Sequence, residues 1–249
     1  MGETTKIEWT NVPGYIGGSW NPWQGCRKKS EGCANCYMYR DKTRFGQDPS
    51  KVILSKPPTF NMPMKQQEPH AWFTCSWSDF FNPEADDWRE MAWNIIQSTP
   101  RHLYMILTKL PERIERCLPW DWGTGYKNVW LGTSVENQRW ADRRIPALLK
   151  VPAVKRFLSC EPLLGPVDIW SYLEYCDAAI WGNRKIDWVI CGGESGSDYR
   201  PMDIQWVEDI ANQCKAASTP VFVKQDSGTF PGTKGRLPDH LWNLKEFPV

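Results

Sequence analysis

Residues 20–39 read WNPWQGCRKKSEGCANCYMY and carry Cys26, Cys33 and Cys36 in a C-x6-C-x2-C pattern. A glycine stands directly before two of these cysteines, and glycine tolerates the unusual backbone angles of a loop folded around a ligand. Deprotonated thiols are soft ligands that select iron–sulfur clusters, zinc or copper(I). The stretch therefore predicts a metal-binding loop, which follows the first strand of the fold.

Beyond this loop, short apolar runs alternate with helical patterns. The runs that predict strands are residues 71–76, 103–107, 129–132, 155–159, 187–191 and 220–223. Helical spacing is found at residues 38–45, 88–97, 111–117, 137–150 and 204–217. Strands alternating with helices indicate crossover units and a parallel sheet. With the strand before the cysteine loop, about seven strands predict an α/β fold, a TIM-like (β/α) barrel or partial barrel. An open doubly wound sheet is the alternative.

The chain of 249 residues is expected to form a single domain. Residues 1–20 would be a lead-in and residues 227–249 a short C-terminal appendage packed over the last strand, while the proline-rich segment 46–70 is expected to be irregular. The net charge of +1 on the whole chain does not indicate a nucleic-acid or acidic membrane partner. No apolar run matches a membrane span and no signal-peptide pattern is present, so we expect a cytoplasmic protein without membrane contact.

Polar side chains follow nearly every predicted strand. Ligands bind at the carboxyl ends of the strands in parallel α/β folds, so these side chains are expected to line one pocket. The expected lining residues are Ser76, Asp79, Ser134, Glu136, Glu161 and Glu194, with Lys224 across from them. Helix capping is an alternative role for Ser134, Ser195 and Asp79. The pair Gly192-Gly193 suggests a backbone that a ligand approaches closely.

The cysteine loop admits three interpretations. A structural zinc site needs four ligands, usually in two pairs, and only Cys33 and Cys36 form such a pair, so a fourth ligand such as Cys75 would have to come from the next strand. A plain loop with free thiols does not explain the grouping. A [4Fe–4S] cluster held by three thiolates leaves one iron open, which suits three ligands best. The cysteines expected not to bind it are Cys75, Cys117, Cys160, Cys176, Cys191 and Cys214.

The segments NPWQGC (21–26) and GCANCY (32–37), followed by a barrel pattern, resemble the radical S-adenosylmethionine superfamily, in particular its spore-photoproduct-lyase-like branch. Over nearly its full length the chain also resembles a phage-associated family of uncharacterised proteins. The stretches that carry this second resemblance include SWSDFF (76–81), VWLGTSVENQ (129–138), SCEPLLGPVD (159–168), WVICGGESG (188–196) and VFVKQ (221–225). The loop departs from the superfamily's usual x3-x2 spacing, and Asn35 stands where an aromatic residue is usual.

The resemblance implies an enzyme with a [4Fe–4S] cluster and S-adenosylmethionine as cofactors and an electron donor as a partner. One electron from the cluster would cleave the sulfonium bond, and the resulting 5′-deoxyadenosyl radical would abstract a hydrogen atom from the substrate. Cofactor contacts are expected from Tyr37, Ser76, Asp79, Ser134 and Glu136, with Asp79 on the methionine ammonium and Ser134 and Glu136 on the ribose. Catalytic roles facing the substrate are expected for Glu161, Glu194 and Lys224.

The expected substrate is a nucleobase or nucleic acid, although another small molecule fits the same chemistry. Aromatic and basic side chains near the loop suit base stacking and phosphate contact, namely Trp20, Trp23, Tyr37, Tyr39 and Trp77 with Arg27, Lys28 and Lys29. The alternative is that these tryptophans belong to the core and that residues 27–29 form a solvated turn. The rival function is a non-catalytic module that binds zinc or a cluster and docks a partner or nucleic acid.

Overall fold

The computed structural model describes residues 5–174 and 184–248. The chain divides into two compact units. Unit 1 comprises Met1–Leu131 and Pro152–Val154, and unit 2 comprises Gly132–Val151 and Lys155–Val249. The proposed metal-binding loop therefore belongs to unit 1, whereas most of the carboxylates predicted to follow the later strands belong to unit 2.

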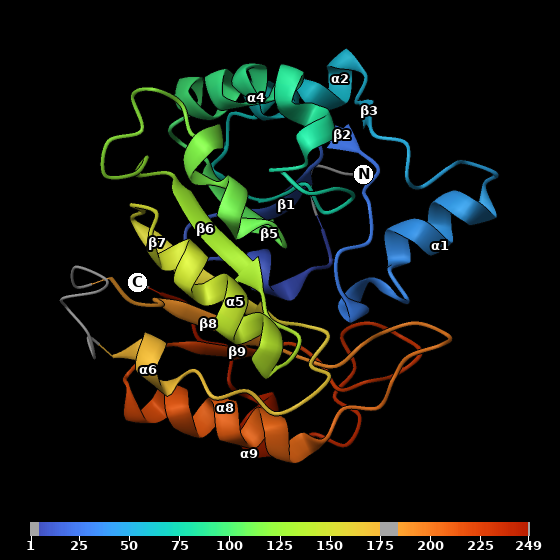
Figure 1. The fold of residues 1–249 in the computed structure, drawn as a ribbon, viewed down its shortest axis with the longest axis vertical. Coiled ribbons are helices and arrows are strands. Elements are labelled where there is room, and N and C mark those ends of the chain that lie inside the picture. Colours follow the sequence, from blue (N-terminus) through green and yellow to red (C-terminus); the bar gives the residue numbers. More distant parts are fainter. Residues whose placement is uncertain (1–4, 175–183, 249) are drawn as a thin grey trace. The chain divides into compact units, whose positions relative to one another are not determined.

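Seven strands form one sheet in the order β1-β4-β5-β6-β7-β8-β9 (Figure 1). They are β1 (Ile16–Trp20), β4 (His70–Thr74), β5 (Leu103–Thr108), β6 (Val129–Ser134), β7 (Lys155–Cys160), β8 (Trp188–Cys191) and β9 (Val221–Val223). Pairing is parallel from β1 through β4 to β5 and from β7 through β8 to β9. The strands follow chain order without the reversal of a doubly wound sheet. The predicted α/β fold of the partial-barrel type is therefore confirmed.

In unit 1, short elements surround the cysteine loop. The helices are α1 (Tyr37–Arg44), α2 (Pro57–Phe60), α3 (Met62–Lys65) and α4 (Asp86–Ser98), and two residues each of β2 (Trp23–Gln24) and β3 (Ile53–Leu54) pair antiparallel. Segment 46–70 is thus less irregular than expected. Both of its short helices have proline within their first two positions, where the missing N–H has no helical acceptor to lose. Figure 1 shows α1 set off from the strands of this unit.

The predicted helix at residues 111–117 is wrong. The structure has two separate 3-10 turns there, η4 (Pro111–Arg113) and η5 (Glu115–Cys117). The other described 3-10 turns of the chain are η1 (Glu8–Thr10), η2 (Glu31–Cys33) and η3 (Pro83–Ala85). The guanidinium of Arg113 turns inward, where its Nε donates to the carbonyl oxygen of Phe81 at 2.6 Å and its Nη2 pairs with Asp86. These contacts hold the segment against the loop after β4, and proline at position 119 prevents a continuing helix.

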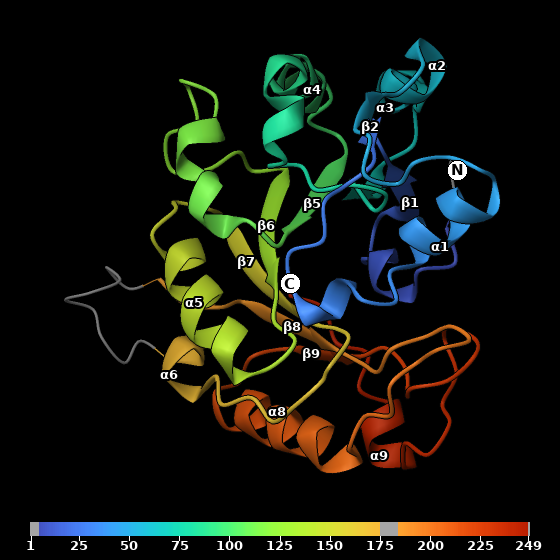
Figure 2. The same cartoon turned by 45° about the vertical axis from the view of Figure 1, so that its right-hand side comes forward.

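In unit 2, Figure 2 shows helices along one face of β7, β8 and β9. The helices are α5 (Gln138–Leu149), α6 (Trp170–Leu173), α8 (Ile204–Ala216) and α9 (Asp239–Trp242). Asn137 caps α5 by accepting from the Trp140 N–H, and Asp203 caps α8 by accepting from the Gln205 N–H. Ser134 and Ser195 are therefore not the caps of these helices, and the capping alternative for them is wrong.

The C-terminal segment packs against the last strand, as expected. The N–H of Val223 donates to the carbonyl oxygen of Leu244 at 2.8 Å, and the N–H of Glu246 donates to Val221 at 3.1 Å. The indole N–H of Trp188 on β8 also donates to the carbonyl oxygen of Glu246 at 2.8 Å. Residues 244–246 thereby occupy the free edge of β9. Among the described residues, no helix has the length and apolar character needed to cross a membrane.

Candidate functional site

The cysteine loop of unit 1 is tied to the loop that follows β4. Asn21, directly after β1, accepts from the backbone N–H of Trp77 at 2.7 Å and donates to the hydroxyl of Ser76 at 3.0 Å. The N–H of Gly25 donates to the carbonyl oxygen of Trp77 at 2.9 Å, and the Ser78 hydroxyl donates to that of Gly25. The stretch SWSD and the start of the cysteine loop therefore form one hydrogen-bonded structure.

Gly25 is required where it stands. Its φ is +97°, a value that side-chain-bearing residues rarely adopt, and a Cβ at this position would lie 2.2 Å from the carbonyl oxygen of Lys51. The next residue, Cys26, donates its N–H to Pro49 at 3.0 Å. The close neighbour of this glycine is therefore the protein's own backbone, and the glycine lets the loop pass beneath residues 49–52.

Cys26, Cys33 and Cys36 are half-buried free thiols. The pKa of Cys26 is raised by burial first and then by the negative charges of Asp79, Cys33 and Cys36, with Lys29 opposing. The three sulfurs thus lie within electrostatic reach of one another. In residues 5–174 and 184–248, no set of three or more His, Cys, Asp or Glu side chains has the geometry of a metal site. The donors fit a soft cation in chemistry, and the loop would have to close around it.

Two tyrosines of α1 donate hydrogen bonds, one to the loop after β4 and one to the cysteine loop. The Tyr37 hydroxyl donates to the carbonyl oxygen of Ser76, and the Tyr39 hydroxyl donates to that of Cys26 at 2.5 Å. The pKa of Tyr39 is raised by burial and then by Cys26. Tyr37, predicted to contact a cofactor, remains 41% exposed, so its ring is accessible although its hydroxyl is engaged.

The carboxylate of Asp79 is buried and holds three donors of the protein. Its Oδ1 accepts from the Phe81 N–H at 2.9 Å and the Thr108 hydroxyl at 2.7 Å, and its Oδ2 accepts from the Lys109 N–H at 2.8 Å. Burial raises the pKa of Asp79, and these hydrogen bonds counteract part of that rise. Asp79 therefore joins the loops after β4 and β5; its predicted contact with an ammonium stays a prediction.

Trp20 and Trp23 are fully buried. Their indole N–H groups donate to the carbonyl oxygens of Phe60 at 2.9 Å and Asp79 at 3.1 Å. Their expected role in base stacking is wrong, because no face of either ring reaches solvent. Both residues instead form the core beneath the cysteine loop, as the alternative interpretation had it.

In unit 2, Ser134 and Glu136 share one arginine. Nη1 of Arg144, on α5, donates to the Ser134 carbonyl oxygen at 2.9 Å and to Oε2 of Glu136 at 2.7 Å. Both side chains of this ion pair are buried, and the guanidinium lies 3.9 Å from the Trp140 ring centroid. The structure gives Glu136 an internal partner that the sequence analysis missed, and its predicted contact with a ribose stays a prediction.

The remaining predicted residues form two further ion pairs. Nζ of Lys224 lies 2.5 Å from Oε1 of Glu161, and both side chains keep some exposure. Glu194 is buried and accepts two bonds from the guanidinium of Arg200, at 2.7 and 2.9 Å. Lys224 was expected to lie across from the carboxylates, and its contact with Glu161 agrees with that expectation. Arg200 was missed, although a buried carboxylate calls for a cationic partner somewhere in the chain.

Gly193 is approached closely by the protein's own backbone, and the expected approach of a ligand stays a prediction. A Cβ there would lie 2.3 Å from the backbone N of Ser227. The same serine hydroxyl accepts from the Met202 N–H at 2.8 Å, and the Gly228 N–H donates to Glu194 at 3.1 Å. The two glycines thus allow the loop after β8 to pack against the loop after β9.

Four of the other cysteines, Cys75, Cys160, Cys191 and Cys214, are buried and behave as interior side chains, whereas Cys117 is half-buried. Burial raises the pKa of the Cys75, Cys160 and Cys214 thiols, and it raises that of Cys191 to about 12. Such thiols pack as small hydrophobic groups. Cys176 lies outside the described residues. The structure therefore brings Tyr37, Ser76 and Asp79 to the cysteine loop in unit 1. In unit 2, Glu136, Glu161, Glu194 and Lys224 lie in separate ion pairs, and Ser134 accepts from Arg144 through its backbone carbonyl oxygen. One pocket common to both sets stays a prediction.

A family model described as a protein of unknown function, DUF5131, matches residues 4–237. The chain belongs to the DUF5131 family. The match to DUF5131 begins before β1 and extends past β9, so it includes the cysteine loop and all seven strands of the sheet. Neither the curated proteins nor the solved structures contain a match to this chain.

Proposed function

We propose that this protein is a radical S-adenosylmethionine enzyme whose cysteine loop holds a [4Fe–4S] cluster and whose substrate is a nucleobase or nucleic acid. The observation that supports this most is the grouping of three half-buried thiols, Cys26, Cys33 and Cys36, within electrostatic reach on one loop. Thiolates this close repel one another, and an iron site would remove that repulsion. When bound, the cluster and S-adenosylmethionine would supply a carbon radical that abstracts hydrogen from the substrate.

The chain's own residues would position these groups. The side chain of Asn21 and the hydroxyl of Ser78 hold the loop after β4 against the cysteine loop. The same hydrogen bonds would keep Ser76 and the ring of Tyr37 at the edge of a bound cofactor. Asp79 would act indirectly, because its hydrogen bonds to three donors hold the loops after β4 and β5 together.

Lys224 and Glu161 are the pair proposed to face the substrate. The side chain of Lys224 is 20% exposed and that of Glu161 is 17% exposed, so a substrate can contact both without a rearrangement of the core. An ammonium held by a carboxylate can donate a proton or orient an anionic substrate. Glu194 is less accessible, because the bidentate contact with Arg200 covers it.

The test is anaerobic reconstitution with iron and sulfide, followed by measurement of iron, sulfide and visible absorption. Alanine in place of Cys26, Cys33 or Cys36 is expected to abolish most iron binding, since three thiolates are needed to hold the cluster. Cys117→Ala is the matched control, because Cys117 is also half-buried and its thiol lies outside the loop. Full iron retention by the Cys26→Ala protein would show that the assignment is wrong. A colourless protein with stoichiometric zinc would favour the non-catalytic module.

A further inference from the structure

One segment of unit 1 carries a strong excess of positive charge. Residues 27–56, here called the basic segment, contain eight Lys and Arg residues against three Asp and Glu, a net charge of +5. The whole chain carries only +1, so the remaining residues carry −4. A near-neutral protein therefore presents a strongly basic region, and such an asymmetry is typical of surfaces that bind polyanions.

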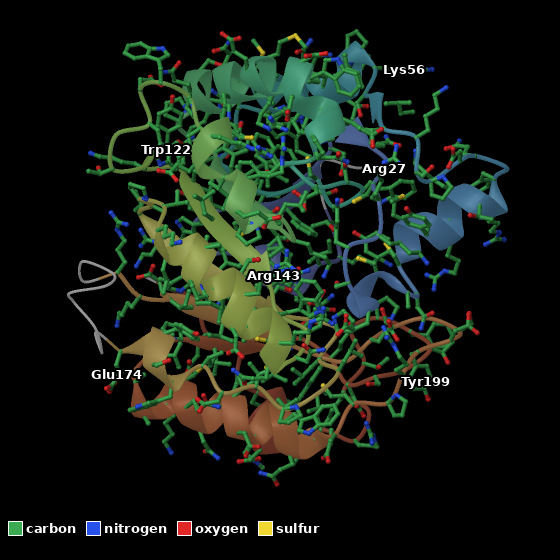
Figure 3. All side chains as sticks on the ribbon, viewed as in Figure 1. Arg27, Lys56, Trp122, Arg143, Glu174 and Tyr199 are labelled. Carbon is green, nitrogen blue, oxygen red and sulfur yellow. The ribbon has the colours of Figure 1, made fainter. Side chains whose placement is uncertain are left out.

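Nearly all of this charge is at the surface. Lys42 is buried, and the exposed members are Arg27, Lys28, Lys29, Arg40, Arg44, Lys51 and Lys56. Figure 3 shows the labelled Lys56 pointing outward from unit 1. The ion pairs of Arg27 with Glu84 and of Arg40 with Asp41 are solvent-exposed. Exposed pairs are weak, so a phosphate can compete for these cations.

The basic segment also presents an aromatic ring. Arg40 and Arg44 are four residues apart on α1 and so lie on the same helix face. Phe45 follows directly and is 73% exposed, so its ring is open to a stacking partner. Cations that follow a phosphate backbone, combined with an exposed ring, are the features of surfaces that bind unpaired nucleotides.

We infer that the basic segment binds single-stranded nucleic acid, with its cations on the phosphates and Phe45 stacked on a base. A paired duplex would hide its base faces from this ring, and a membrane would use the cations without stacking. The binding itself stands apart from the iron–sulfur cluster. Only its identification as the docking surface for the substrate rests on the proposed function.

The test measures binding of fluorescent single-stranded RNA and DNA of about 20 nucleotides by anisotropy across a salt series. The triple variant Arg40→Ala, Arg44→Ala, Lys51→Ala is expected to bind at least tenfold more weakly, and the slope of log affinity against log salt should fall by about two. The control variant Arg116→Ala, Lys150→Ala, Lys215→Ala removes the same charge from exposed positions outside the basic segment and should bind as the wild type does. Phe45→Ala should weaken binding about tenfold with an unchanged salt slope.

Three results would overturn the inference. They are equal losses in the triple variant and its control, equal affinity for duplex and single strand, and binding to anionic vesicles without binding to nucleic acid. Iron loading of the triple variant is measured in parallel and should match the wild type. A failure of nucleic-acid binding would then leave the cluster assignment standing, and a failure of the cluster would leave the binding surface standing.

Discussion

The hydroxyl of Ser78 donates a hydrogen bond of 2.5 Å to the carbonyl oxygen of Gly25, while the N–H of Gly25 donates to the carbonyl oxygen of Trp77. One peptide segment of the cysteine loop is thus held at both its donor and its acceptor by the loop after β4. The position of Cys26, the next residue, is fixed by this double contact. The shape of the candidate metal loop therefore depends on residues about 50 positions further along the chain.

Gly25→Ala is expected to destabilise the protein by about 3 kcal/mol, because alanine would be strained at this φ and would collide with the Lys51 carbonyl group. Gly46→Ala is the control. It has a φ of +66° but nothing within 4 Å of the added Cβ, so it should cost only about 1 kcal/mol. Urea unfolding of both variants measures the difference. Equal losses of stability in the two variants would mean that the Lys51 carbonyl group does not exclude a side chain at position 25.

Asp79→Ala is expected to lower the free energy of unfolding by about 3 kcal/mol or more, because it removes the acceptor of three donors, two of which are buried. Asp79→Asn keeps one acceptor oxygen and should cost less. Denaturant titration of the two variants distinguishes them. If Asp79→Ala unfolds at the wild-type midpoint, Asp79 is not holding the two loops together.

Glu136→Ala is expected to cost about 4 kcal/mol, since it leaves the buried guanidinium of Arg144 without its carboxylate. The exposed pair of Lys234 with Asp239 provides the comparison, and Asp239→Ala should change stability little. Thermal or chemical unfolding measures both. A small effect at Glu136 would indicate that water or another group takes its place.

Acid is expected to destabilise unit 1 through His102. Burial lowers the pKa of His102 from 6.5 to about 4; its Nδ1 accepts from the His70 N–H, and its Nε2 lies 2.8 Å from the Pro63 carbonyl oxygen. The folded state therefore binds the proton less tightly than the unfolded state does. This contribution is complete above pH 6.5 and is lost as the pH falls towards 4, with a total of about 3 kcal/mol.

The measurement is urea unfolding between pH 7 and pH 4 for the wild type and His102→Gln. The variant should be less stable at pH 7 and should show a smaller loss on acidification, because glutamine does not titrate. Identical pH profiles for the wild type and His102→Gln would contradict the assignment.

The strands from β4 to β9 were predictable because each is a buried run with few polar interruptions, the pattern of parallel strands covered on both faces. β5 begins at Leu103 as predicted, and β9 begins one residue later than predicted. The two-residue strands β2 and β3 were not predictable, because strands of that length carry no periodicity. The segment at 111–117 had helical spacing, but the inward contacts of Arg113 overrode it.

The candidate site was harder to predict from sequence. Three cysteines within eleven residues indicate a loop without any knowledge of the fold, whereas the partners of the carboxylates depend on how distant segments meet. Arg144 reaches Glu136 from a helix that packs back onto the strand, and Thr108 reaches Asp79 from the neighbouring strand. Sequence spacing does not specify such contacts. The burial of Trp20 was equally hidden, because a tryptophan beside a polar loop fits either the core or a binding surface.

The segment 244–246 has a consequence for biosynthesis. The edge of β9 gains its hydrogen bonds to Leu244 and Glu246 only from residues that are translated after every other strand of the sheet. Unit 2 can therefore complete its structure only once residue 246 has left the ribosome exit tunnel. Unit 1 draws nearly all its residues from the first 131 and can begin to fold during translation. The nascent chain would thus carry its cysteine loop in a formed unit while the second unit is still being synthesised.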